Sequence, residues 1–317
     1  MKRFFVILLL ALGLTCPQPA TIGSSGDSTS WVTTLSARNK KSDKKKSKKN
    51  KRDPKSKKKL KQQSKRSQPG AIVPLIGSLN ATASKGTQAL CRVTIPAATA
   101  CQTINYKAIT VYFNRRLRIP LCVAYELTGT MVAMADAPTA EKRRNYKFLT
   151  DDNVPGCPSH RDYSGSGYTR GHMAPAMDMR GDRETMRECF YMTNMCPQVA
   201  KLNNDNWRIM EEAVHRWARR DGRLIVLTGP IMGNSREHIG PRNDIAVPEA
   251  FYKVIYAPQQ QRAIAFIYAN SDHNGGMARH ATTINEVERR TGLDFFTALS
   301  RDTESKIEAQ CDLNAWK

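Results

Sequence analysis

Short runs of apolar and β-branched residues, separated by polar or Gly/Pro turns, recur through the second half of the chain. Residues 120–133 and 223–227 each predict a strand, and Gly229-Pro230 closes the second of these. Two further apolar runs, residues 251–256 and 263–268, lie on either side of a Pro-Gln-Gln-Gln turn. This spacing predicts a β-hairpin.

Residues 205–220 have the periodicity of a helix instead. Large apolar side chains recur three or four positions apart and share one face of that helix: Trp207, Met210, Val214 and Trp217. Asn203 or Asn204 is positioned to cap its start, and Gly222 ends it. Residues 283–290 predict a second, shorter helix.

These strands outnumber the helices and do not alternate regularly with them, so the pattern predicts an α+β fold rather than a doubly wound one. We expect a central, largely antiparallel sheet flanked by helices, in one domain over residues 88–317. No run of about 18 or more apolar residues occurs, which excludes a polytopic membrane protein.

The first twenty residues have a different pattern. Lys2 and Arg3 precede an apolar run over residues 4–14, and small or Pro residues follow it. This arrangement predicts a secretory signal peptide over residues 1–20 and therefore a secreted protein, periplasmic or extracellular. The residues before Cys16 match poorly the small-residue box that precedes a lipidated cysteine, so we expect no lipid anchor there.

Charge distinguishes the next segment. The chain has a formal net charge of +22, and residues 38–66 alone hold 17 Lys/Arg against 2 Asp, a net +15. Residues 21–87 contain too few large apolar groups to offset chain entropy, so we expect them to be disordered. The lysine run is either a solvated tether or a weak, non-specific contact for polyanions such as nucleic acid.

Seven cysteines remain once the predicted signal peptide is removed, enough for three disulfides in an oxidising compartment. Spacing leaves the connectivity open. Cys91 and Cys101 enclose a short Thr/Ala-rich segment and could close a loop, and Cys157 and Cys196 flank the motif described next and could cross-link it. The chain has no C-x2-C and no suitably spaced His pair, which argues against structural zinc.

The densest chemical signal is Tyr168-Thr-Arg-Gly-His-Met-Ala-Pro. Arg170 and His172 alternate along this extended segment and so share one face. A neutral imidazole with a pKa near 6.5 can take a proton from water while a guanidinium holds a phosphate, which suits phosphodiester hydrolysis. Taken alone, the triplet is better explained by a packed histidine beside a surface arginine.

A second signal surrounds the predicted helix. Glu211 lies beside the apolar stripe, where a carboxylate needs an arginine partner or a role in organising a metal. Asn203 precedes Glu211 by eight residues, about 12 Å along a helix, too far for both to ligate one ion. This spacing is satisfied if Asn203 binds the ion directly and Glu211 acts through a coordinated water, because Mg²⁺ keeps most of its waters.

Together these blocks resemble the DNA/RNA non-specific endonuclease family, the ββα-metal nucleases of endonuclease G type. The similarity spans about residues 105–300, and the resemblance implies a ββα-metal motif within the fold. Four ordered segments carry it, at residues 122–128, 144–146, 169–175 and 193–211.

The resemblance implies a role for each of six residues. These are His172 as general base, Asn203 as the sole protein ligand of Mg²⁺, Arg144 and Arg170 as phosphate-binding arginines, Glu211 as the carboxylate that orients metal-bound water, and Asn194 as a supporting residue. The ion stabilises developing charge and the leaving 3′-oxygen, and Mn²⁺ is compatible with the same site. Cleavage in this family leaves 5′-phosphate ends.

One position departs from the family pattern. Thr169 stands where the family usually has Asp before Arg-Gly-His. Because that Asp is neither base nor direct ligand in this scheme, we expect impaired tuning rather than lost catalysis.

The leading hypothesis is a secreted, Mg²⁺-dependent, sugar-non-specific endonuclease for single- or double-stranded DNA and RNA. The competing hypothesis is a catalytically inactive polyanion- or nucleic-acid-binding protein that uses its Lys-rich segment. A zinc-dependent HNH-type or phospholipase-like hydrolase is more distant, because this region lacks the additional His or Asp ligands. No protein partner is inferred, and a homodimer is compatible with the sequence.

Overall fold

The computed structural model describes residues 85–317. The predicted signal peptide, and all but the last three residues of the segment predicted to be disordered, lie outside the described residues. The first described element is helix α1 (Lys85–Leu90). Within it Thr87 is buried; its hydroxyl donates to Glu126 Oε1 (3.1 Å) and accepts from Arg223 Nη2 (2.7 Å). Residues 85–87 are therefore folded rather than disordered.

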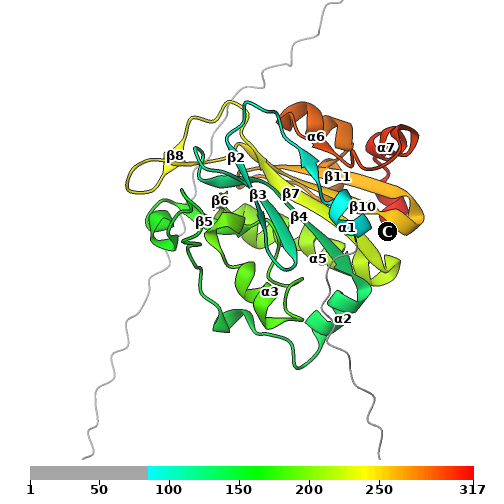
Figure 1. Ribbon diagram of the computed structural model, residues 1–317, viewed down its shortest axis with the longest axis horizontal. Helices are drawn as coiled ribbons and strands as arrows, with labels where there is room; N and C mark the ends of the chain where they lie inside the picture. Colours follow the sequence, from blue (N-terminus) through cyan, green and yellow to red (C-terminus); the bar gives the residue numbers. More distant parts are fainter. Residues whose placement is uncertain (1–84) are drawn as a thin grey trace, which may run out of the picture. The chain divides into compact units, whose positions relative to one another are not determined.

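A seven-stranded sheet, antiparallel throughout, forms the centre of this domain (Figure 1). The predicted α+β class and the predicted antiparallel sheet are confirmed. In spatial order its strands are β12 (Ala281–Thr282), β11 (Arg262–Ala269), β10 (Ala250–Ala257), β7 (Arg223–Ile231), β4 (Ile119–Thr128), β3 (Ile109–Asn114) and β2 (Cys101–Asn105). The hairpin predicted over residues 251–268 is β10–β11.

Two strand boundaries differ from the sequence prediction. The strand predicted over residues 120–133 ends at Thr128, whose side chain accepts from Met131 N and caps helix α2 (Gly129–Asp136). Strand β7 continues through Gly229-Pro230 instead of closing there. Beyond Thr228 it pairs with β10 alone, and a proline is tolerated where one neighbouring strand has ended.

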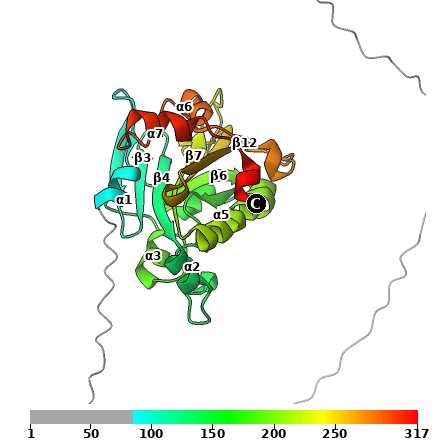
Figure 2. The same ribbon diagram turned by 90° about the vertical axis from the view of Figure 1, so that its right-hand side faces the viewer.

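Both faces of the sheet are covered. In β7, Leu224 and Val226 belong to one core together with helix α5 (Arg208–Asp221), whereas Ile225 and Leu227 belong to a second core. Helices α6 (Ile284–Thr291) and α7 (Arg301–Glu308) pack into that second core (Figure 2). A strand buried on both faces has no polar side, which explains why residues 223–227 are an uninterrupted apolar run.

A separate two-stranded sheet and helix α5 form the ββα motif, and both pack into the first core. Strands β5 (Tyr168–His172) and β6 (Met195–Val199) pair antiparallel, with His172 opposite Met195. Strand β6 leads directly into α4 (Ala200–Leu202), a π-helical turn η4 (Asn203–Trp207) and α5. The helical run thus begins at Ala200, so neither Asn203 nor Asn204 is its cap. Its predicted end at Gly222 is confirmed, with a φ of 81°.

The other described elements are short connections. They are α3 (Arg183–Glu188), η1 (Arg143–Asn145), η2 (His160–Tyr163), η3 (Met192–Asn194), η5 (Pro258–Gln260), η6 (Met277–Arg279), η7 (Leu313–Trp316), and two small sheets, β1 (Val93–Thr94) with β13 (Asp294–Phe295) and β8 (His238–Ile239) with β9 (Ile245–Ala246). The second predicted helix is α6, capped by Thr283. Across residues 85–317, every helix is too short or too polar to span a bilayer.

Neither of the two cysteine pairings considered from the sequence is present among the described residues. All seven cysteines of the described residues are free thiols. Cys196 is fully buried opposite Gly171, and Cys157 Sγ accepts a hydrogen bond from Asp151 N (3.3 Å). A free cysteine behaves as a small hydrophobic side chain, and this role explains the four that are buried: Cys91, Cys122, Cys189 and Cys196.

Candidate active site

Part of the ββα motif and the segment around η1 enclose a cavity of about 360 Å³. Its lining residues are Arg143, Phe148, Tyr168, Thr169, Arg170, His172 and Asn203. Three of the predicted site residues, His172, Arg170 and Asn203, therefore meet at one place although they come from a strand and from a helical turn. Arg144, Glu211 and Asn194 do not line it.

Gly171 brings β5 close to β6. A Cβ at Gly171 would lie 2.3 Å from Gln198 Oε1 and 2.7 Å from Gln198 Cβ, distances that real Cβ atoms do not adopt. Only glycine allows this approach. It fixes the positions of the two residues on either side, Arg170 and His172, relative to the start of the helical run.

His172 lies in an aromatic environment. Its ring centroid is 5.0 Å from that of Phe190 and 5.6 Å from that of Phe148, and within the described part of the chain its buried Nε2 has no hydrogen-bond partner. Burial, and secondly the nearby charge of Arg143, lower the pKa of His172 to about 3. The expectation of an imidazole titrating near pH 6.5 is therefore wrong for this structure.

Two guanidinium groups flank the Phe148 ring. Arg170 Nε donates to the backbone carbonyl of His160 (3.0 Å), as does its Nη2, and its Cζ is 5.4 Å from the Phe148 centroid. Arg143 Cζ is 5.3 Å from the same centroid and 4.2 Å from that of Phe190.

The second arginine of this pair is Arg143, whereas the sequence predicted a phosphate contact for Arg144. Both arginines are exposed, but only Arg143 lines the cavity. Both lie in the 3₁₀ turn η1, where adjacent side chains point in different directions. A tandem Arg-Arg shows that a cation is present, but the turn decides which of the two faces the site. The role predicted for Arg144 stays a prediction.

The amide of Asn203 is oriented by a chain of hydrogen bonds. The Thr169 hydroxyl donates to the backbone carbonyl of Gln198 (2.8 Å), so its oxygen is left to accept from Asn203 Nδ2 (3.0 Å). Because the amide nitrogen is held by Thr169, Asn203 Oδ1 remains available as a ligand. The residue that departs from the family pattern therefore contacts the predicted metal ligand directly.

Asn194 is buried behind the site. Its Oδ1 accepts from Ala174 N (2.9 Å), and its Nδ2 donates to the carbonyls of Ala174 (3.0 Å) and Cys189 (2.8 Å). The two bonds to Ala174 fix the backbone two residues beyond His172, and the third ties it to Cys189. The supporting role that the resemblance implies for Asn194 stays a prediction.

Glu211 lies in the interior near a buried lysine. Its Oε1 is buried and, within residues 85–317, has no hydrogen-bond partner. Burial raises the pKa of Glu211, and the nearby Lys253 opposes that rise. Lys253 is fully buried and its Nζ donates to Thr228 Oγ1 (2.8 Å); sequence reasoning missed it because one Lys within an apolar strand gives no pattern. The predicted role of Glu211 stays a prediction.

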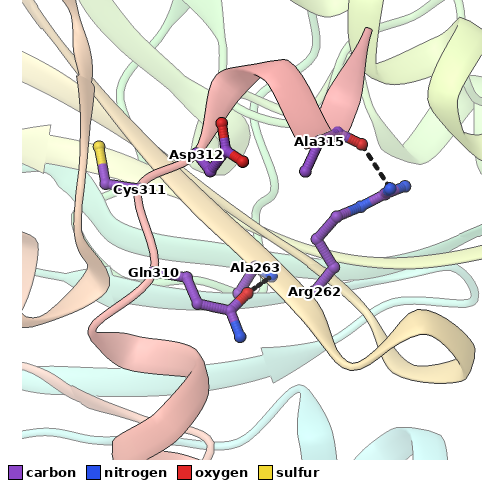
Figure 3. Close-up of a pocket in the computed structure, with 6 residues that line it drawn as sticks. All are labelled: Arg262, Ala263, Gln310, Cys311, Asp312 and Ala315. Carbon is purple, nitrogen blue, oxygen red and sulfur yellow. Dashed lines mark hydrogen bonds between the residues drawn. The ribbon is translucent and has the colours of Figure 1, made fainter.

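A second cavity, of about 260 Å³, lies between β11 and the C-terminal segment (Figure 3). Gln310 Oε1 accepts from Ala263 N (2.8 Å), and Arg262 donates to the carbonyl of Ala315. These bonds hold the C-terminal segment against the sheet, so the cavity is a packing feature of the fold.

Comparison with known proteins gives a consistent result. Residues 86–302 match the sequence model of the family described as DNA/RNA non-specific endonuclease. The chain is 32% identical over 243 residues to "Nuclease 1, mitochondrial" of Schizosaccharomyces pombe, covering 69% of this chain and 74% of that protein. It is 31% identical over 221 residues to "Nuclease C1" of Cunninghamella echinulata var. echinulata, covering 65% of this chain and 86% of that protein.

A solved structure is similar in fold. It is a crystal structure of the EndoG/EndoGI complex, described as showing the mechanism of EndoG inhibition. The TM-score is 0.60 at 28% sequence identity, over 70% of this chain and 95% of that chain.

The relatives also correct the predicted location. The Schizosaccharomyces pombe protein and several other relatives are named as mitochondrial nucleases. Their names point to mitochondria, so the periplasmic or extracellular location inferred from residues 1–20 is wrong.

The matched range covers the ββα motif, the cavity and all four sequence segments that carry the resemblance. Fold and sequence thus agree over most of the described chain. The chain belongs to the DNA/RNA non-specific endonuclease family.

Proposed function

We propose that the protein hydrolyses phosphodiester bonds of both DNA and RNA to 5′-phosphate ends, with His172 as general base and Asn203 as the ligand of a Mg²⁺ ion. The observation that carries this proposal is that His172, Asn203 and Arg170 line one cavity. A base, a neutral oxygen ligand and a phosphate-binding cation in one place are what this reaction requires.

The residues present fit a hydrated Mg²⁺. Asn203 offers an uncharged amide oxygen whose orientation is set by Thr169, and Mg²⁺ is typically bound by few protein oxygens while it retains several waters. Mn²⁺ accepts the same ligand type. When bound, the ion supplies a Lewis acid that stabilises negative charge on the phosphate and on the leaving 3′-oxygen.

His172 accepts a proton from the attacking water. The lowered pKa keeps the imidazole neutral at physiological pH, so its Nε2 is free to accept that proton. An incoming phosphate brings negative charge that counters Arg143 and raises the pKa of the imidazole toward neutrality.

Arg170 and Arg143 bind the phosphate. Arg170 is immobilised by the His160 carbonyl and Phe148, so little side-chain entropy is lost when it contacts substrate. A contact to the phosphate group alone distinguishes neither the base nor the sugar. This agrees with a substrate range that covers DNA and RNA.

The experiment is turnover of duplex DNA and of RNA by wild type and His172→Ala. We expect His172→Ala to lose at least about 100-fold in kcat, the usual contribution of a general base. His273→Ala, at an exposed histidine, is the matched control and should retain wild-type turnover. A His172→Ala rate within about tenfold of wild type would show that His172 is not the base.

Removal of the metal tests whether cleavage depends on Mg²⁺. EDTA should stop cleavage, and added Mg²⁺ or Mn²⁺ should restore it. Activity that persists in EDTA would contradict a Mg²⁺-dependent reaction.

A further inference from the structure

Three carboxylates converge at a place remote from the active-site cavity. Glu288 in α6, Asp294 in β13 and Glu308 at the end of α7 each contribute an oxygen, and these oxygens all lie within 4.8 Å of one another. Helices α6 and α7 lie side by side and contribute to the second core (Figure 1). The active-site strand lies against the other core, since Met173 and Ala174, which follow His172, belong to the first core.

The buried member of this acidic cluster is Glu308. The residue is only 8% exposed, and its Oε1 is buried without a hydrogen-bond partner in the described part of the chain. Glu288 Oε1 accepts from Phe295 N (2.8 Å), and its carboxyl group also interacts with that of Glu308. An unpaired carboxylate this deeply buried is costly unless something with positive charge lies beside it.

The described part of the chain supplies no such charge. Among residues 85–317, no Lys, Arg or His forms an ion pair with Glu288, Asp294 or Glu308. Glu304 adds a further negative charge nearby. Burial, and the other carboxylates, raise the pKa of Glu308 to about 8, and burial chiefly raises that of Glu288 to about 7. The cluster therefore needs either a bound proton or a bound cation.

The geometry admits a cation of calcium size. Two oxygens that bind one Ca²⁺ at about 2.3–2.6 Å can be no more than about 5 Å apart, and the three oxygens of the cluster, which lie within 4.8 Å of one another, meet this condition. The donors are all carboxylate oxygens, which hard cations prefer. Asp294 is exposed, so the remaining coordination positions are open to water.

We propose that Glu288, Asp294 and Glu308 bind one Ca²⁺ ion, and that this ion fastens helix α7 to α6 and β13. The site is separate from the catalytic cation and does not depend on the proposed function. Bound Ca²⁺ neutralises the cluster and stabilises the C-terminal part of the domain. β13 also pairs with β1, so the same ion supports the attachment of the first described strand.

The test is Ca²⁺ binding by the full chain after removal of divalent ions with EDTA. Isothermal titration with Ca²⁺ alone, without nucleic acid, should show binding, and the Tm should rise with Ca²⁺ concentration because the ion binds only the folded state. Asp294→Asn and Glu308→Gln should each weaken Ca²⁺ binding at least about tenfold. Asp302→Asn removes an exposed carboxylate from α7 outside the cluster and should bind Ca²⁺ like wild type.

Asn203→Ala separates this site from the catalytic one. It should keep the Ca²⁺-dependent rise in Tm; loss of the rise in that variant would place the ion in the active site and overturn the proposal. The absence of both heat and a Tm rise in wild type would overturn it as well. A third outcome would also overturn the proposal: Glu308→Gln is more stable than wild type, and Ca²⁺ stabilises neither protein. In that case a shared proton, rather than a cation, neutralises the cluster.

Discussion

At His172 the folded environment changes the pKa that the sequence alone predicts. A histidine in an exposed strand would titrate near its ordinary pKa. The rings of Phe148 and Phe190 remove water from this one, and Arg143 adds like charge to its protonated form. Both effects disfavour the imidazolium, so the folded protein holds a neutral base over the physiological pH range.

This environment predicts the pH dependence of cleavage. A lowered pKa means that His172 loses its proton-accepting form only when the solution is acidic, so the acidic limb of kcat/KM should lie well below pH 6.5. The measurement is kcat/KM against pH at saturating Mg²⁺. Arg143→Gln should move that limb to higher pH, whereas Arg143→Lys, which keeps the charge, should leave it in place. A wild-type limb centred at pH 6.5 or above would contradict the burial argument.

At the scale of elements, the π-helical turn η4 decides how Asn203 is used. Asparagine before an apolar helical stripe is typical of a cap, but here α4 extends the helix upstream and the Asn203 amide reaches across to β5. A π-helical turn carries an extra residue per turn and often marks a functional position. It redirects one side chain without ending the helix, and no periodicity in the sequence reveals it.

The contact between β5 and η4 predicts the effect of changing Thr169. Thr169→Val keeps the shape but removes the acceptor for Asn203 Nδ2, so the Mg²⁺ concentration needed for half-maximal rate should rise about 10- to 100-fold. Thr169→Ser retains the hydroxyl and should behave like wild type. Thr169→Asp, the residue usual in the family, should also retain the acceptor. Equal Mg²⁺ dependence of Thr169→Val and Thr169→Ser would show that this hydrogen bond does not position the ligand.

At the scale of the whole molecule, two cores on opposite faces of one sheet form the framework for the site. The first core contains the residues beside His172 and the α5 stripe; the second contains α6 and α7. The site is therefore built on packed elements, and four of the described cysteines contribute to this packing as buried thiols rather than as cross-links.

The Lys-rich segment distinguishes the nuclease from a protein that only binds polyanions. Deleting residues 38–66, which carry a net +15, should leave turnover at low salt intact but make the fall of kcat/KM with salt shallower, because fewer counterions are released. Replacing its 17 Lys/Arg by Gln keeps the length and should have the same effect. Loss of nearly all nucleic-acid binding and turnover in both variants would favour the binding hypothesis.

Sequence by itself determined the α+β class, the β10–β11 hairpin, the α5 stripe and its end at Gly222, and the residues His172, Arg170 and Asn203. Each depends on local periodicity, on turn chemistry or on spacing along one segment. The tertiary structure alone decided which of two adjacent arginines faces the cavity, the lowered pKa of His172, the free state of the cysteines and the acidic cluster at Glu308. These depend on desolvation and on contacts between segments far apart in the chain, and neither quantity is a property of a short stretch of sequence.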